Sequence, residues 1–210
     1  LLFKTLTYKN KKPRKYPLTL KDILRSIYVY TNIFIVILVV HIVGFVLLSL
    51  GGKTKKHQQQ YHLLLHHVFR SILRFAPNNG YVVHNRELLQ DKPKIIIANH
   101  QSIVDIVAVL ALSPNIVIVV NDWVWNSFWI GKIIRYAGFM KIDQDLLFNT
   151  DQIEERLRNG YSVVIFPEAT RSVDCTIGNF HKGAFYLAQQ LNLDIQPIIL
   201  HGTGHIVPKN

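Results

Sequence analysis

The stretch KIIIANHQSIVDIVAVLAL, residues 94–112, changes from one hydrophobic pattern to another near its centre. Its first six residues, 94–99, include a run of isoleucines, which is typical of a strand buried on both faces of a sheet. Residues 102–112 then carry apolar side chains at helical spacing, and Ser102 is suited to cap such a helix. A strand followed directly by a helix is the repeating unit of α/β proteins, so this stretch predicts the fold class.

The same alternation continues along the rest of the chain. Further strands are expected at residues 115–121, 139–143, 162–167 and 195–200, and helices at residues 126–137, 147–159 and 182–192. Apolar strands separated by helices favour a mostly parallel sheet flanked by helices. We therefore expect an α/β domain over residues 76–210, with its functional side chains beyond the carboxyl ends of the strands.

Positive charge is concentrated near the amino terminus. The formal net charge is +11, yet residues 76–210 hold eleven Lys or Arg against twelve Asp or Glu. The excess therefore lies in the first 75 residues, on both sides of an apolar segment. Basic clusters in that arrangement favour membrane lipids, and not nucleic acid, as the partner.

The apolar segment between the basic clusters is long. No charged residue occurs between Arg25 and Lys53, and the stretch IFIVILVVHIVGFVLLSL is almost wholly apolar. Residues 57–75 are instead amphipathic. We expect a basic segment over residues 1–26 and membrane-associated helices over residues 27–75, arranged as a hairpin; a single span and a buried soluble helix are the alternatives.

Metal and thiol chemistry have little support. The amphipathic stretch contains His57, His62, His66 and His67, but no carboxylate or sulfur ligand lies near them in sequence. We interpret these histidines as polar residues at the membrane interface. Cys175 is the only cysteine, and its neighbours offer no base or positive charge to activate it. We expect no bound metal or other bound cofactor.

The first candidate motif is a histidine and an aspartate at the end of the first strand. In a regular helix, His100 and Asp105 would point in different directions, so they meet only if His100 stands in the turn before the helix. Asp105 would then orient the imidazole, which could act as a general base without a protein nucleophile. Two unrelated polar residues at a turn are the alternative.

The second candidate motif, FPEATRS at residues 166–172, follows another expected strand. Arg171 can bind a phosphate or carboxylate through two hydrogen bonds, and Glu168 can position that group. The alternative is a surface ion pair of little energetic value.

Together the motifs resemble those of the glycerolipid acyltransferase family, the 1-acylglycerol-3-phosphate acyltransferases and their relatives. NHQSIVD is similar to that family's N-H-x4-D block, and FPEATRS to its F-P-E-G-T-R-S block, in the same order. GFMKIDQ and IQPIIL resemble two further blocks. The resemblance implies an O-acyltransferase of phospholipid metabolism. It would move a fatty acyl group from acyl-CoA or acyl carrier protein (acyl-ACP), as co-substrate, to the hydroxyl of 1-acylglycerol-3-phosphate or a related lysolipid.

The resemblance also implies site roles. His100 and Asp105 would be catalytic, and Glu168, Thr170 and Arg171 would bind the acceptor. Gln144 stands where the family's second block usually has arginine. Lys141 is a substitute cation if its strand bends or ends there, and the missing arginine leaves the acceptor head group open.

The resemblance leaves other functions to be tested. A membrane-associated hydrolase or thioesterase could use the same base to activate water, and a non-catalytic lipid-binding module would need no base. Ala169 replaces the family's usual glycine, which would be costly if that position required a positive φ. We expect a membrane protein at the cytoplasmic face of the inner (plasma) membrane. The chain opens with Leu1 and has a single methionine, so we expect a piece of a longer polypeptide, open to fusion with another domain.

Overall fold

The computed structural model describes residues 2–3, 20–51, 54–75, 81–89, 91–128, 130–142, 150–207 and 209. Gln144 and residues 147–149 of an expected helix lie outside this set.

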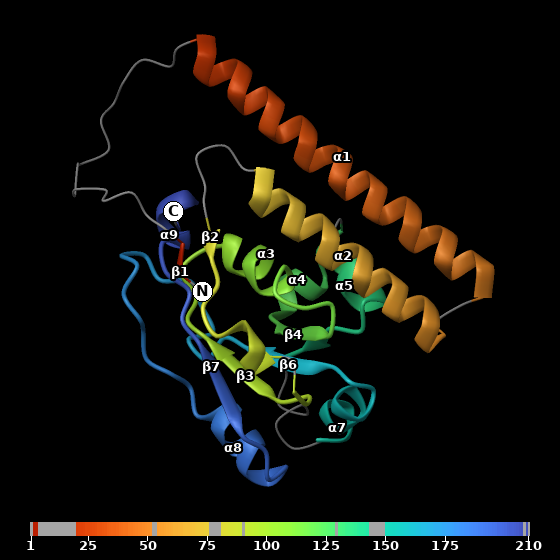
Figure 1. The fold of residues 1–210 in the computed structure, drawn as a ribbon, viewed down its shortest axis with the longest axis vertical. Helices are drawn as coiled ribbons and strands as arrows, with labels where there is room; N and C mark the ends of the chain where they lie inside the picture. The colour runs from red at the N-terminus through yellow and green to blue at the C-terminus, as the bar shows by residue number, and fades with distance from the viewer. Residues whose placement is uncertain are drawn as a thin grey trace.

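Five strands form one parallel sheet, as the continuous apolar runs predicted. They are β3 (Ile95–Ala98), β4 (Ile116–Val120), β5 (Met140–Lys141), β6 (Ser162–Ile165) and β7 (Ile195–Ile198). Their order across the sheet is β5-β4-β6-β3-β7, and each neighbouring pair is parallel (Figure 1). The expected α/β class and all five expected strands are confirmed.

The sheet order explains how two distant motifs can meet. β3 pairs with β6 in the register Ile95↔Val163 to Ile97↔Ile165. Because the strands are parallel and adjacent, their carboxyl ends lie side by side, and the segments that follow them start from the same edge. β7 pairs with the other side of β3. The strand that precedes His100 is therefore held between two neighbours.

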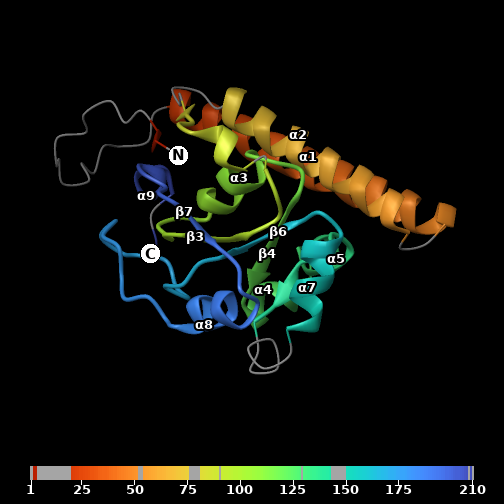
Figure 2. The same ribbon diagram turned by 60° about the horizontal axis from the view of Figure 1, so that its bottom comes forward.

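Helices cover both faces of the sheet. They are α3 (Val104–Leu110), α4 (Asp122–Trp125), α5 (Gly131–Tyr136), α7 (Asp151–Arg158), α8 (Gly183–Gln190) and α9 (Thr203–Ile206), with a 3₁₀ turn η1 (Arg86–Leu89). In Figure 2, α3 lies on one side of the sheet and α7 and α8 on the other. Residues Ile95, Ile96, Val117 and Val163 are at most 1% exposed, as expected for strands covered on both faces.

Two details of the domain differ from the sequence prediction. The helix expected over residues 126–137 is shorter and is represented by α5 alone, and neither α4 nor α9 was expected. A small antiparallel pair, β1 (Leu2–Phe3) with β2 (Tyr81–Val82), joins the start of the chain to the start of the domain.

The amino-terminal helices form an antiparallel hairpin. α1 (Leu20–Gly51) and α2 (Lys55–Phe75) run side by side, with α2 between α1 and α3 (Figures 1 and 2). α1 begins at Leu20, so the expected boundary at residue 26 falls inside a helix. In the described part of the chain, no helix has the length and apolar character needed to cross a membrane.

The interpretation of the α2 histidines was wrong for two of the four. His62 and His66 are 3% and 5% exposed and face the domain, not a membrane interface. Their ring N–H groups donate to backbone carbonyls, His62 Nε2 to Ala137 at 2.6 Å and His66 Nδ1 to Leu110 at 3.1 Å. Burial lowers the pKa of His62 to about 4 and also lowers the pKa of His66. Neutral imidazoles with satisfied donors therefore fasten α2 to the domain.

The outer surface of α1 is strongly apolar. The side chains of Phe34 and Phe45 are 63% and 72% exposed, and further large apolar residues are exposed beside them: Ile35, Leu38, Val39, Ile42 and Val46. Val40 is buried, and a Cβ on Gly44 would lie 3.2 Å from the Tyr61 ring, which shows how closely α1 approaches α2.

Candidate active site

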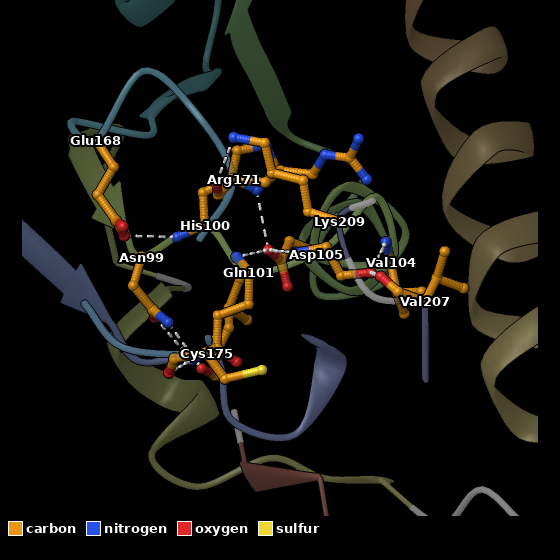
Figure 3. Close-up of polar contacts among 12 residues, drawn as sticks. Asn99, His100, Gln101, Val104, Asp105, Glu168, Arg171, Cys175, Val207 and Lys209 are labelled. Atoms are coloured by element: carbon orange, nitrogen blue, oxygen red, sulfur yellow. Dashed lines mark hydrogen bonds and ion pairs between the residues drawn. The ribbon is translucent and has the colours of Figure 1, made fainter. Parts of the chain in front are cut away.

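His100 and Asp105 form a hydrogen-bonded pair at the end of β3. His100 lies in the turn before α3 and Asp105 in the helix's first turn, as the five-residue spacing required. The distance from His100 Nδ1 to Asp105 Oδ2 is 2.9 Å (Figure 3). The carboxylate accepts from Nδ1–H, so the other imidazole nitrogen, Nε2, carries the lone pair and can accept a proton.

Asp105 is fully buried, and backbone groups support its charge. Its Oδ2 atom also accepts from the backbone N–H groups of Gln101 at 2.6 Å and Ser102 at 2.8 Å. Such donors stabilise the ionised carboxylate in a place that water does not reach. The Ser102 hydroxyl accepts from Val104 N–H at 3.2 Å, but the N-cap position of α3 is Ile103 and not Ser102 as expected.

The segment after β6 holds His100 from the other side. The backbone N–H of His100 donates to Glu168 Oε1 at 2.8 Å, and its carbonyl accepts from Ser172 N–H at 2.8 Å. The ring of Phe166 packs on the imidazole, with 4.4 Å between ring centroids. The two motifs identified in the sequence are therefore in direct contact.

Glu168 has a different environment from the one expected of an acceptor-binding residue. It is 5% exposed, and its second oxygen, Oε2, accepts from the backbone N–H of Gly178 at 2.9 Å. Each carboxylate oxygen thus accepts from a backbone donor, one at His100 and the other at Gly178, farther along the loop after β6. This geometry makes Glu168 a positioning residue that ties the loop after β6 to the turn that carries His100.

Ala169 occupies the left-handed region of backbone conformation, with φ of 56°. This is the strained case expected if alanine replaced a glycine that needed a positive φ. The Ala169 carbonyl accepts from Asn121 Nδ2 at 3.1 Å, which links this turn to the end of β4.

Thr170 and Arg171 lie at the same edge of the sheet and are joined there by a residue that the sequence interpretation missed. Lys209 Nζ donates to Thr170 Oγ1 at 2.9 Å and to the Arg171 carbonyl at 3.0 Å. Figure 3 shows Arg171 and Lys209 beside the His100–Asp105 pair. Lys209 was missed because it lies near the end of the chain, outside every motif.

Lys141 ends β5, which was the condition for it to serve as a substitute cation. Its ammonium forms an ion pair with Asp122 Oδ1 at 2.5 Å, and this hydrogen bond lowers the pKa of the Asp122 carboxyl. The charge of Lys141 is therefore already partnered. Gln144 lies outside the described residues.

Two other residues near His100 were missed or given little weight. The side-chain amide of Asn99 donates to the Leu200 carbonyl at 2.9 Å and accepts from Leu200 N–H at 2.7 Å, continuing the β3–β7 pairing beyond the strand. The carbonyl of Cys175 accepts from Gln101 Nε2 at 2.7 Å. Burial and the charges of Asp174 and Asp105 raise the pKa of the Cys175 thiol, which disfavours the reactive thiolate.

Metal ligands are not clustered in the described ranges. No group of three or more His, Cys, Asp or Glu side chains there is placed to hold a metal ion.

Comparison with known proteins gives matches over the same region. The family model described as Acyltransferase matches residues 80–201. A 1-acyl-sn-glycerol-3-phosphate acyltransferase of Chlamydomonas reinhardtii is 33% identical over 145 residues, 63% of this chain and 42% of that protein. The chloroplastic 1-acyl-sn-glycerol-3-phosphate acyltransferase LPAT1 of Arabidopsis thaliana is 34% identical over 122 residues, 56% of this chain and 34% of that protein. The chain thus spans less than half the length of these two relatives.

A solved structure has the same fold. The crystal structure of the 1-acyl-sn-glycerophosphate acyltransferase PlsC from Thermotoga maritima superposes with a TM-score of 0.72, covering 90% of this chain and 78% of that chain at 23% identity. At this identity the likeness establishes the fold. The family match extends over more than half of the sequence and includes both motifs, so the chain belongs to the acyltransferase family.

Proposed function

We propose that this chain transfers a fatty acyl group from acyl-CoA or acyl-ACP to the hydroxyl of 1-acylglycerol-3-phosphate or a related lysolipid. The observation that carries the proposal is a buried carboxylate orienting one imidazole with no protein nucleophile bonded to it. Among the described residues, the hydrogen bond of the His100 ring is the one from Nδ1 to Asp105, and no serine, threonine or cysteine side chain is bonded to the ring. A base in this setting acts on a group that the substrate brings.

The reaction follows from this geometry. His100 Nε2 removes the proton of the acceptor hydroxyl as its oxygen attacks the thioester carbonyl carbon. The C–O bond forms, the C–S bond breaks, and the proton passes to the departing thiolate. Asp105 stabilises the imidazolium that forms in between. The thioester supplies the driving force, so the proposal requires no bound cofactor or metal.

The comparisons support the acceptor class. The relatives that match carry the name 1-acyl-sn-glycerol-3-phosphate acyltransferase, and Arg171 provides a cation near His100 for the phosphate of such an acceptor. Arg171 has no hydrogen-bond or ion-pair partner for its guanidinium within the described ranges.

The test is a panel of lysolipids offered with both acyl-CoA and acyl-ACP. We expect diacylated product with the wild-type chain and a loss of about 10²-fold or more in His100→Ala, the usual effect of removing a general base. His84→Ala, at an exposed histidine of the same domain, is the matched control. Free fatty acid released at the same rate with or without lysolipid would show a thioesterase instead. Full function in His100→Ala would favour a lipid-binding module.

We also propose that α1 and α2 attach the chain to the lipid surface at the cytoplasmic face of the inner membrane. The support is the exposed apolar surface of α1 together with the basic clusters of the first 75 residues. Attachment of this kind would bring the site to an acceptor and a product that are both lipids.

A further inference from the structure

The end of the described chain is held against the site. After α9, the Val207 carbonyl accepts from the Ser102 hydroxyl at 2.8 Å, and α9 itself packs on α3. Lys209 follows two residues later and reaches the turn after β6 through Thr170 and Arg171. The carboxyl-terminal segment therefore bridges the two motifs, and its last described side chain is a cation.

Neither cation at this position has an acidic partner in the described part of the chain. Lys209 Nζ donates to two neutral oxygens, which leaves one of its three N–H donors available. The hydrogen bonds of the nearby carboxylates go to other groups, and Asp105 Oδ1 is buried with no partner. Glu168 is bound by backbone donors, Asp105 by His100 and backbone, and Asp174 Oδ1 by Ser172 and Thr176.

Lys209 Nζ lies against the backbone of Arg171, and two positively charged side chains from contacting segments, neither with an acidic partner, favour an anionic ligand. Ser172, the residue after Arg171, donates its backbone N–H to the His100 carbonyl at 2.8 Å, so the loop that carries Arg171, and that Lys209 contacts, adjoins the candidate base.

We propose that Lys209 binds the acceptor's phosphate together with Arg171. This inference rests on the proposed function and deepens it. Lys209 supplies the cation that is missing from the second block, where Gln144 replaces arginine. Lys141 is less suited to this role because Asp122 already neutralises its charge. A phosphate monoester, with a charge of about −1.5 to −2 at neutral pH, matches two cations, whereas a neutral or zwitterionic head group leaves positive charge unbalanced.

The phosphates of CoA share this chemistry and are the other source of such an anion. The contact of Lys209 with the loop that is bonded to His100 favours the acceptor, whose hydroxyl must reach the imidazole. The experiment separates the two sources by varying acceptor and donor independently.

The test compares Lys209→Met, Lys209→Arg and the wild-type 210-residue chain in detergent micelles. Acceptors are lysophosphatidate and monoacylglycerol, and donors are acyl-CoA and acyl-ACP. For Lys209→Met we expect the KM for lysophosphatidate to rise roughly tenfold, the effect of losing one charge-assisted hydrogen bond. The KM for acyl-CoA and the rate with monoacylglycerol should change less than about twofold, and Lys209→Arg should retain the wild-type KM.

The matched control is Lys92→Met, which removes the same charge at a distant site. The Lys92 side chain is 71% exposed, and it lies before β3 at the opposite end of the sheet. An unchanged lysophosphatidate KM in Lys209→Met would overturn the inference. If Lys209→Met lowered the rate with monoacylglycerol as much as with lysophosphatidate, Lys209 would have a structural role only. A raised KM for acyl-CoA would assign Lys209 to donor binding.

Equilibrium binding without donor separates this inference from the proposed function. Should the wild type acylate no lysolipid, the proposed function fails. Binding of lysophosphatidate that weakens in Lys209→Met but not in Lys92→Met would still support the phosphate site. Equal binding by both variants would overturn it.

Discussion

His100 is constrained at every part of the residue. Its N–H and carbonyl are bonded to Glu168 and Ser172, its Nδ1 to Asp105, and its ring face packs on Phe166. Only the Nε2 edge remains for a substrate. General base catalysis depends on this kind of preorganisation, because a displaced base loses the hydrogen-bond geometry that proton transfer requires.

Replacing Glu168 tests its role as a positioning residue. In Glu168→Gln an amide N–H₂ must face one of the backbone donors that the carboxylate now accepts, so we expect a stability loss of about 2 kcal/mol. The kcat should fall by about tenfold or more, with the acceptor KM changed less than about twofold. Glu155→Gln, at an exposed residue of α7, should match the wild type. A rise in acceptor KM with normal kcat would instead restore the acceptor-binding role.

Ala169 predicts a stabilising substitution next to the site. Because its φ is 56°, Ala169→Gly should relieve strain and raise the free energy of unfolding by up to about 1 kcal/mol. Chemical denaturation measures this directly. Ala188→Gly, inside α8, should have the opposite sign and cost about 1 kcal/mol. Destabilisation by both would show that Ala169 is not strained.

At the scale of elements, the junction between α2 and the domain predicts a pH dependence. The pKa of His62 is about 4 when folded, against the ordinary histidine pKa of 6.5, so between these pH values the unfolded chain binds a proton that the folded chain does not. This stabilising contribution is complete above about pH 6.5 and is lost as the pH falls towards 4, by about 2 kcal/mol at about pH 5.

Thermal unfolding at about pH 7.5 and about pH 5 measures the effect. His62→Gln keeps an N–H donor for the Ala137 carbonyl but cannot titrate, so its Tm should fall less than the wild type's over this range. His67→Gln, at an exposed histidine of the same helix, is the control. An equal fall in Tm for His62→Gln and wild type would contradict the assignment.

The exposed surface of α1 predicts the strength of lipid attachment. Phe34→Ser and Phe45→Ser should each weaken binding to anionic vesicles by roughly tenfold, since burying a phenylalanine contributes about 1.5–3 kcal/mol. Both side chains are exposed, so stability in detergent should not change. Phe185→Ser, on α8 at the opposite face of the sheet, should bind vesicles like the wild type. Vesicle sedimentation gives the comparison, and equal binding by every variant would refute docking through α1.

At the scale of the whole molecule, the charge asymmetry predicts a salt effect. Lys and Arg outnumber acids thirteen to one in the first 75 residues, so vesicle binding should strengthen with anionic lipid and weaken as salt rises. Neutral vesicles should show little salt dependence. Equal binding to neutral and anionic vesicles would indicate attachment by apolar contact alone.

Different parts of this molecule were predictable to different degrees. Hydrophobic patterns identified the five strands, most clearly β3, β4 and β6, which are largely buried. The His100–Asp105 spacing led to the correct local geometry. Sheet order could not be predicted, since β-pairing between β3 and β6 depends on packing that no local pattern encodes. His62 and His66 were misassigned because a polar side chain is predicted to be exposed unless the backbone carbonyl that it bonds in the folded protein is known. Lys209 and Asn99 act through contacts distant in sequence, which leave no local signal.

The position of β3 between β6 and β7 has a consequence for how the protein becomes active during its own synthesis. β3 is the first strand of the sheet to be made, yet its partners β6 and β7 follow only at residues 162–165 and 195–198. His100 leaves the ribosome long before Glu168 exists to hold it, and Leu200 must be present before Asn99 can complete the β3–β7 edge. A nascent chain that stops before β7 would carry both motifs without a working arrangement of them. Activity should therefore arise in one late step, when the last strand closes beside the first.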